Sequence, residues 1–145
     1  MTNKVSEVEP MLAWEMLRDH EDSVLVDVRT QAEWSFVGLP DLSELGKQPL
    51  LIQWMTLPAM QQNPDFLDGL LNQLDGAAPS RILFLCRSGA RSMAAASLTA
   101  EAFAAQGKTV ECVNIAEGFE GDLNENRHRG DLNGWKARGL AWRQS

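Results

Sequence analysis

The 145-residue sequence contains no tyrosine, two cysteines and two histidines. Two cysteines cannot form the disulfide framework that stabilises many small secreted proteins. The sequence also has no clustered Cys/His set of the kind that binds a structural or catalytic metal. We therefore expect no metal and no other cofactor, and we expect the protein to work in a reducing compartment, the cytoplasm.

Long apolar runs and an excess of basic residues are also missing. No run approaches the roughly 18 apolar residues that suggest a membrane span, and residues 1–10 lack the apolar core of a signal peptide. The 20 acidic residues outnumber the 13 basic residues, which gives a net charge of −7. These features predict neither a membrane nor a nucleic-acid partner, and they leave the oligomeric state open.

The most informative stretch runs from residue 81 to residue 107. Arg81 to Leu85 is a short apolar run typical of a central parallel strand, and Ser92 to Gln106 is an alanine-rich segment that ends at Gly107, a common helix stop. Cys86 opens the loop between them. The pattern therefore places a cysteine at the carboxyl end of a buried strand, facing the start of a helix.

The rest of the chain alternates between strand and helix patterns. This alternation predicts an α/β fold whose mostly parallel sheet is covered by helices on both faces. No linker or internal repeat interrupts it, so we expect one domain, residues 1–145. The expected strands are 5–9, 23–29, 49–57, 81–85 and 109–114, and the expected helices are 10–17, 31–36, 64–74 with Asn63 as N-cap, 92–106 and 134–138.

The loop after Cys86 has the features of an anion-binding site around a nucleophile. Backbone N–H groups from Arg87 to Arg91 would curl around the sulfur, and the unpaired N–H groups of the first helical turn would add partial positive charge. The side chains of Arg87 and Arg91 add full charges nearby. These contributions favour the thiolate form of Cys86, the form that acts as a nucleophile.

The smaller residues of the loop are expected to contact the sulfur or to shape the backbone around it. Ser88 and Ser92 could hydrogen-bond the sulfur, although Ser92 could equally cap the helix. Gly89 is expected to supply a backbone conformation that turns the N–H groups inward, and Ala90 completes the loop. The alternative is a buried structural cysteine in a tight turn, which two flanking arginines make improbable.

Residues 86–92, CRSGARS, resemble the active-site loop of the rhodanese family of sulfurtransferases. The order of other segments agrees with this resemblance: Asp27-Val28-Arg29 followed by Glu33-Trp34 is similar to the family's first signature, and Gly134-Trp135 with Gly139-Leu140 is similar to its ending. One departure lies at residues 37–42, where the family's usual histidine is missing.

The resemblance implies a single-domain, rhodanese-like three-layer fold and a sulfurtransferase. Cys86 would carry sulfur as a persulfide between a small anionic donor such as thiosulfate and an acceptor, either cyanide, a thiol or a protein cysteine. Other members of this class of fold act as binding or redox-sensing modules, and phosphatase or arsenate reductase relatives use a similar loop. These two functions are the alternatives.

The length of the loop distinguishes a sulfurtransferase from a phosphatase. The arginine at the end of the loop gives a Cys-x4-Arg spacing, from Cys86 to Arg91. Tyrosine phosphatases use Cys-x5-Arg because their loop must surround the three equatorial oxygens of a phosphate. A persulfide places one terminal sulfur at the centre, so a smaller ring of N–H groups fits it better. The spacing therefore favours sulfur transfer.

Three further features have two interpretations each. Asp27 or Arg29 could brace the active-site loop, or Arg29 could instead pair with Glu33 to fix the following turn. Cys112 is expected to be a small apolar residue in its strand, although it could also form a disulfide with Cys86. By comparison with the family pattern, residues 116–130 look like an insertion, either a solvated loop or a lid that brings His128 near the persulfide.

Overall fold

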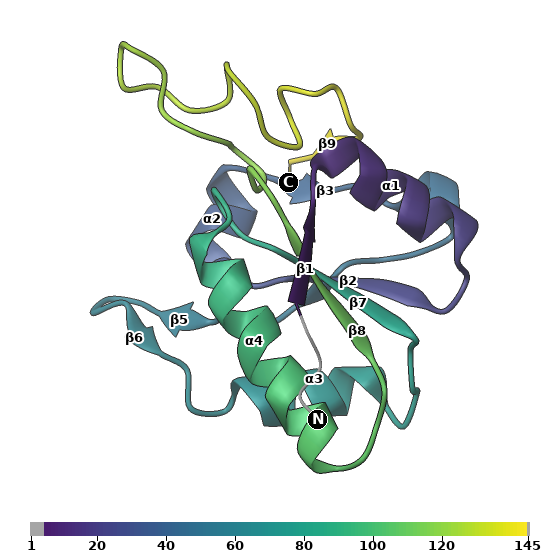
Figure 1. Cartoon of the computed structure of the whole chain (residues 1–145). Coiled ribbons are helices and arrows are strands. Elements are labelled where there is room, and N and C mark those ends of the chain that lie inside the picture. The colour runs from purple at the N-terminus through teal and green to yellow at the C-terminus, as the bar shows by residue number, and fades with distance from the viewer. Residues whose placement is uncertain (1–4, 145) are drawn as a thin grey trace.

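A five-stranded sheet forms the centre of the protein, and the computed structural model describes residues 5–144. Residues 1–4 and 145 of the predicted domain lie outside the described residues. Neighbouring strands are all parallel and follow the order β1-β8-β7-β2-β4, with β7 in the middle (Figure 1). The strands are β1 (Val5–Val8), β2 (Ser23–Asp27), β4 (Leu50–Leu51), β7 (Arg81–Leu85) and β8 (Glu111–Ile115).

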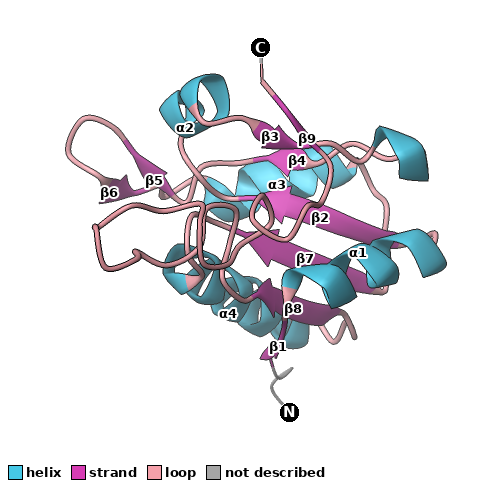
Figure 2. Cartoon of the chain, turned by 90° about the horizontal axis from the view of Figure 1, so that it is seen from above, coloured by secondary structure: helices cyan, strands magenta, loops and turns pink. Residues whose placement is uncertain are grey.

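Helices cover both faces of this sheet, which confirms the predicted α/β fold with three layers. Helices α3 (Phe66–Leu74) and α4 (Ala90–Ala105) pack on one face, and α1 (Pro10–Asp19) packs on the other (Figures 1 and 2). The short helix α2 (Gln31–Phe36) follows β2. Among residues 5–144, no helix has both the length and the apolar character needed to cross a membrane.

Side-chain alternation along the strands explains how two apolar cores form. In β7, Ile82 and Phe84 point into the core under α3 and α4, whereas Leu83 and Leu85 point into the core under α1. This period of two is the expected one for a strand that is buried on both faces. The same alternation in β8 directs Cys112 towards the α4 side. Asn114 lies two residues further along and therefore shares that face.

Three of the predicted segments differ from the structure. Residues 49–57 contain β4 and then leave the sheet, because Met55–Thr56 (β5) pairs instead with Gln61–Gln62 (β6) in a small hairpin. Helix α3 begins at Phe66 rather than at residue 64, because the Asn63 side chain accepts from the N–H of Asp65 and holds a turn there.

The predicted helix at 134–138 is also wrong. A hydrogen-bonded turn occupies these residues, with the N–H of Arg138 donating to the carbonyl of Gly134. Gly134 and Gly139 both have positive φ, which stops a helix from extending in either direction. Beyond the turn, Trp142–Arg143 (β9) pairs with Leu39–Pro40 (β3), and η1 (Ser43–Leu45) is a short 3-10 helix.

Candidate active site

Cys86 lies directly after β7, at the carboxyl edge of the sheet, and the residue is 1% exposed. Helix α4 starts four residues later, so the predicted order of strand, cysteine, loop and helix is present. Gly89 is the N-cap residue of α4 and has φ +114°, a backbone conformation that residues other than glycine rarely adopt. Gly89 therefore supplies the special backbone geometry that the sequence predicted at this position.

Two donors contact the sulfur of Cys86. The N–H of Gly89 lies 3.0 Å from Sγ, and the hydroxyl of Ser92 lies 3.2 Å from it. The sequence predicts a ring of N–H groups from residues 87–91 around the sulfur, whereas the structure pairs one backbone donor with one side-chain donor. Ser92 lies inside the first turn of α4 and is fully buried, so it contacts the sulfur rather than capping the helix.

Arg91 is held by an ion pair rather than left free above the sulfur. Its guanidinium nitrogens lie 2.8 and 2.9 Å from the two carboxylate oxygens of Glu33 in α2. Burial would raise the pKa of Glu33, but the hydrogen bonds and charge of Arg91, together with Thr30, lower it below its ordinary value. Burial likewise opposes the charge of Arg91, and the Glu33 carboxylate raises the pKa of Arg91 overall. This pair neutralises much of the positive charge that Arg91 was expected to provide.

Asp27 and Arg29 form a second ion pair that is completely buried, with 2.6 Å between the nitrogen and the oxygen. The alternative prediction, a pair between Arg29 and Glu33, is therefore wrong, because each of these residues has a different partner. The guanidinium of Arg29 also stacks 4.3 Å above the ring of Phe119. Within residues 5–144, its Nη1 atom has no hydrogen-bond partner.

Phe119 connects this ion pair to the active-site loop. Its backbone N–H donates to the carbonyl of Cys86 at 2.8 Å, and the N–H groups of Glu120 and Gly121 donate to the carbonyl of Arg87. The beginning of the predicted insertion, residues 116–130, therefore supports the loop from behind. The Asp27–Arg29 pair contacts this loop through Phe119, whose ring lies under the Arg29 guanidinium.

The remaining loop residues are more accessible. Arg87 and Ala90 are exposed, and Ser88 is half-buried. Arg87 forms no ion pair within the described part of the chain, which leaves it as the accessible cation beside Cys86. His128 is exposed, and its backbone N–H donates to the Asn124 side chain in a turn of the 116–130 segment.

Cys112 is a buried thiol on β8, paired in register with Ile82 of β7. Burial, together with the charge of Glu111, raises its pKa to about 12, so it is a neutral thiol at physiological pH. Both cysteines are free. This environment agrees with the expectation of a small apolar residue.

The sequence did not identify two residues next to the site. Asn114, which is buried, accepts a hydrogen bond from Ser92, and Gly118 packs against the backbone of Arg87 and Ser88. A polar residue inside the otherwise apolar segment of residues 112–115 is a signal that could have pointed to Asn114. Gly118 makes its contact through the backbone, and no sequence pattern marks such a contact.

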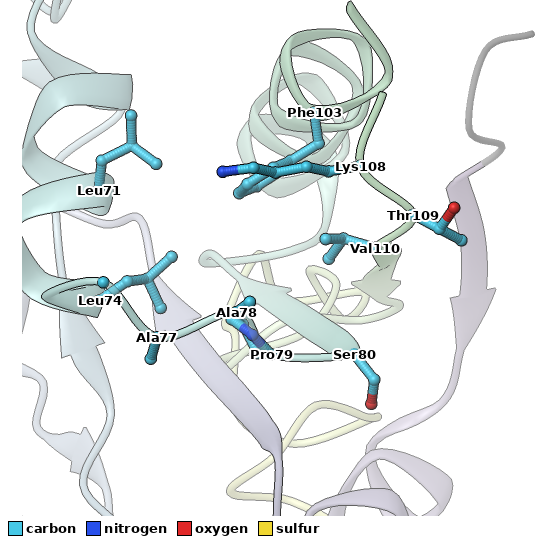
Figure 3. Close-up of a pocket in the computed structure, with 11 residues that line it drawn as sticks. Leu71, Leu74, Ala77, Ala78, Pro79, Ser80, Phe103, Lys108, Thr109 and Val110 are labelled. Atoms are coloured by element: carbon cyan, nitrogen blue, oxygen red, sulfur yellow. The ribbon is translucent and has the colours of Figure 1, made fainter. Parts of the chain in front are cut away.

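A separate cavity of about 520 Å³ lies at the opposite end of the sheet. Its walls include residues that precede β7 and β8, namely Pro79, Ser80, Thr109 and Val110, and the Lys108 side chain runs along the Phe103 ring (Figure 3). Cys86 takes no part in it. Across residues 5–144, no group of three or more His, Cys, Asp or Glu side chains is arranged to hold a metal ion.

Comparison with known proteins relates most of the chain to uncharacterized proteins of Rickettsia. It is 38% identical over 130 residues to the uncharacterized protein RP600 homolog of Rickettsia rickettsii, a match that covers 90% of each chain. The chain belongs to the same family as this protein. The family includes RP600 of Rickettsia prowazekii, which is also 38% identical over 130 residues. The crystal structure of Rv0390 from M. tuberculosis is 43% identical, with a TM-score of 0.84 over 99% of this chain and 100% of that chain. No family model matches the chain.

Proposed function

We propose that the protein is a sulfurtransferase that carries sulfur on Cys86 as a persulfide, as the resemblance to rhodaneses implies. The observation that carries this proposal is the position of the Cys86 sulfur at the start of α4, within hydrogen-bond distance of the Gly89 N–H and the Ser92 hydroxyl. Hydrogen-bond donors aimed at a sulfur stabilise negative charge on it. A thiolate and a persulfide both need such stabilisation.

The reaction would proceed by double displacement. The electron pair of the Cys86 thiolate attacks the outer sulfur of thiosulfate, the sulfur–sulfur bond of the donor breaks, and sulfite leaves with the bonding pair. Arg87, the accessible cation at the site, would attract the anionic donor. A nucleophilic acceptor then removes the outer sulfur and regenerates the thiolate. Cyanide serves as acceptor in a test tube and yields thiocyanate, whereas a thiol or a protein cysteine would serve in the cell.

Intact-protein mass spectrometry tests the covalent step directly. Reduced protein is incubated with thiosulfate, and the mass is measured before and after addition of cyanide. We expect a gain of about 32 Da, one sulfur atom, that maps to Cys86 and disappears with cyanide. The absence of an adduct on folded protein, with thiosulfate and with cysteine-derived persulfide donors, would contradict the proposal. Hydrolysis of a chromogenic aryl phosphate would favour the phosphatase alternative.

A further inference from the structure

A chain of hydrogen bonds leads from the protein surface to the Cys86 sulfur. Glu7, an exposed residue of β1, accepts from the Asn114 amide nitrogen at 2.8 Å. Asn114 accepts in turn from the Ser92 hydroxyl, which also lies 3.2 Å from Sγ. The strand register explains the arrangement, because Glu7 and Asn114 are directly paired between β1 and β8. Side chains of β1, β8 and α4 thus meet behind the nucleophile.

The partners of Asn114 fix which way its amide points. Its nitrogen faces the Glu7 carboxylate and, at 3.2 Å, the carbonyl oxygen of Gly89. Neither group has a hydrogen to donate, so the amide nitrogen must face both of them. The amide oxygen is therefore the atom that faces Ser92, and it acts only as an acceptor. The hydrogen bond that the Asn114 amide nitrogen donates to the Glu7 carboxylate also polarises the amide and strengthens its oxygen as an acceptor.

The Ser92 hydroxyl has one hydrogen and three acceptors within reach: the Asn114 oxygen, the Cys86 sulfur and, at 3.2 Å, the carbonyl oxygen of Gly89. We propose that Asn114 is a positioning residue for Cys86, one that competes with the sulfur for the Ser92 hydrogen. When Cys86 is a thiolate, the hydroxyl rotates towards Sγ and stabilises the charge. When the charge has moved to the outer sulfur of the persulfide, the hydroxyl returns to Asn114. Ser92 thus keeps a partner in both states without moving its oxygen atom.

This inference rests on Cys86 being the nucleophile of the proposed function, and it predicts how the ionisation of Cys86 responds to changes behind it. Weakening Asn114 removes the nearest competitor for the Ser92 hydrogen, and of the two acceptors that remain, Sγ and the Gly89 carbonyl, only the sulfur becomes a stronger acceptor on ionising, which favours the thiolate. The pH profile of Cys86 reactivity should then move to lower pH. Charged groups around the sulfur also act on this profile, and they are left unchanged in the Asn114 test: Arg87, Arg91 with its partner Glu33, the Asp27–Arg29 pair, and Glu7.

The first test compares the native protein with Asn114→Leu, which has a similar size and no polar atoms. The rate of Cys86 alkylation by iodoacetamide is followed against pH, with peptide mass spectrometry to separate Cys86 from Cys112. We expect the midpoint of the rate against pH to fall by about half a pH unit to one pH unit, which corresponds to the energy of one hydrogen bond. In a Ser92→Ala background the same substitution should shift nothing. A midpoint that is unchanged or raised, or a shift that persists without Ser92, would overturn the proposal.

Glu7 provides a test that does not disturb the core, because the residue is exposed. Glu7→Gln and Glu7→Ala lose the same charge, but only glutamine keeps an oxygen for the Asn114 amide. We expect the midpoint pH of the alkylation profile to be lower in Glu7→Ala than in Glu7→Gln. Equal midpoints, or a lower midpoint in Glu7→Gln, would contradict the proposed role of Asn114. Alkylation needs no sulfur donor, so these results stand apart from the mass-spectrometric test. A protein that shows the shift but forms no persulfide would disprove only the sulfurtransferase function.

Discussion

Arg91, in the first turn of α4, is bound through two hydrogen bonds to Glu33, in the first turn of α2. The same carboxylate closes a capping box with Thr30, whose N–H and hydroxyl both donate to it. One carboxylate thus satisfies the start of α2 and anchors the helix that begins at the active-site loop. Both side chains are mostly buried, at 16% and 18% exposure, so the pair is shielded from the solvent.

This ion pair predicts a dependence of stability on pH. The pKa of Glu33 is lower in the folded protein than its ordinary value, so the pair contributes stability above that value and loses it as the pH falls through the folded pKa. At pH 7 we expect Glu33→Gln to reduce the free energy of unfolding by about 1 to 3 kcal/mol. At pH 3, below the ordinary value, the difference should shrink, because the unfolded chain then binds a proton at Glu33 that the ion pair in the folded protein resists.

Urea denaturation at both pH values measures the effect. Glu111→Gln is the matched control, since Glu111 pairs with Arg81 but is 44% exposed. It should cost less than about 1 kcal/mol at pH 7, as exposed ion pairs do. A loss in Glu33→Gln that is equally large at pH 3 and pH 7 would show that the charge of Glu33 is not what stabilises the fold.

The two arginines of the loop should differ in their effect on the donor. Arg87 is exposed, whereas the charge of Arg91 is balanced by Glu33. We expect Arg87→Ala to raise the KM for thiosulfate about two- to fivefold, with the effect fading at high salt. Arg18→Ala on α1 removes the same charge at a position that forms an exposed pair with Asp19, and it should leave KM unchanged. Equal KM values for Arg87→Ala and the native protein would exclude a steering role for Arg87.

The sequence predicted those parts of the structure that depend on local pattern. The apolar run of residues 81–85 and the alanine-rich segment that follows it correctly placed β7, α4 and Cys86, because side-chain periodicity directly reflects burial. The predicted strand at 49–57 failed for the opposite reason. Only Leu50–Leu51 has a neighbouring strand in the main sheet, and whether a neighbour exists is decided by the whole fold.

The contacts that shape the site were harder to predict because they are long-range. Glu33 and Arg91 are 58 residues apart, and Glu7 and Asn114 are 107 residues apart. A single sequence indicates that these residues are polar but not which of them meet. The backbone conformation of Gly89, which has a strong local signal, was predicted correctly. The pair of Arg29 with Glu33 was wrong, because Arg29 pairs with Asp27 and Glu33 pairs with Arg91.

The two cysteines should behave differently in the persulfide reaction. Cys112 is buried and has a pKa of about 12, so it is neither accessible nor ionised at neutral pH. We expect Cys112→Ser to form the Cys86 persulfide at close to the native rate, although placing a hydroxyl in the core should cost about 1 to 3 kcal/mol of stability. Cys86→Ser should remain folded and form no adduct. Equal loss of persulfide in both folded variants would contradict a mechanism with a single cysteine.

The last prediction concerns Gly118, which supports the active-site loop from behind. A Cβ atom at this position would lie 2.4 Å from the carbonyl carbon of Arg87 and 2.5 Å from the nitrogen of Ser88, far inside contact distance. Gly46 has the same φ of +68°, but a Cβ there would meet nothing within 4 Å. Both alanine variants therefore carry the same backbone strain, about 1 to 2 kcal/mol. Only Gly118→Ala should also displace the loop, so it alone should slow persulfide formation and lower the stability further. If the two variants form the persulfide at equal rates, the contact behind the loop has no part in holding Cys86 in place.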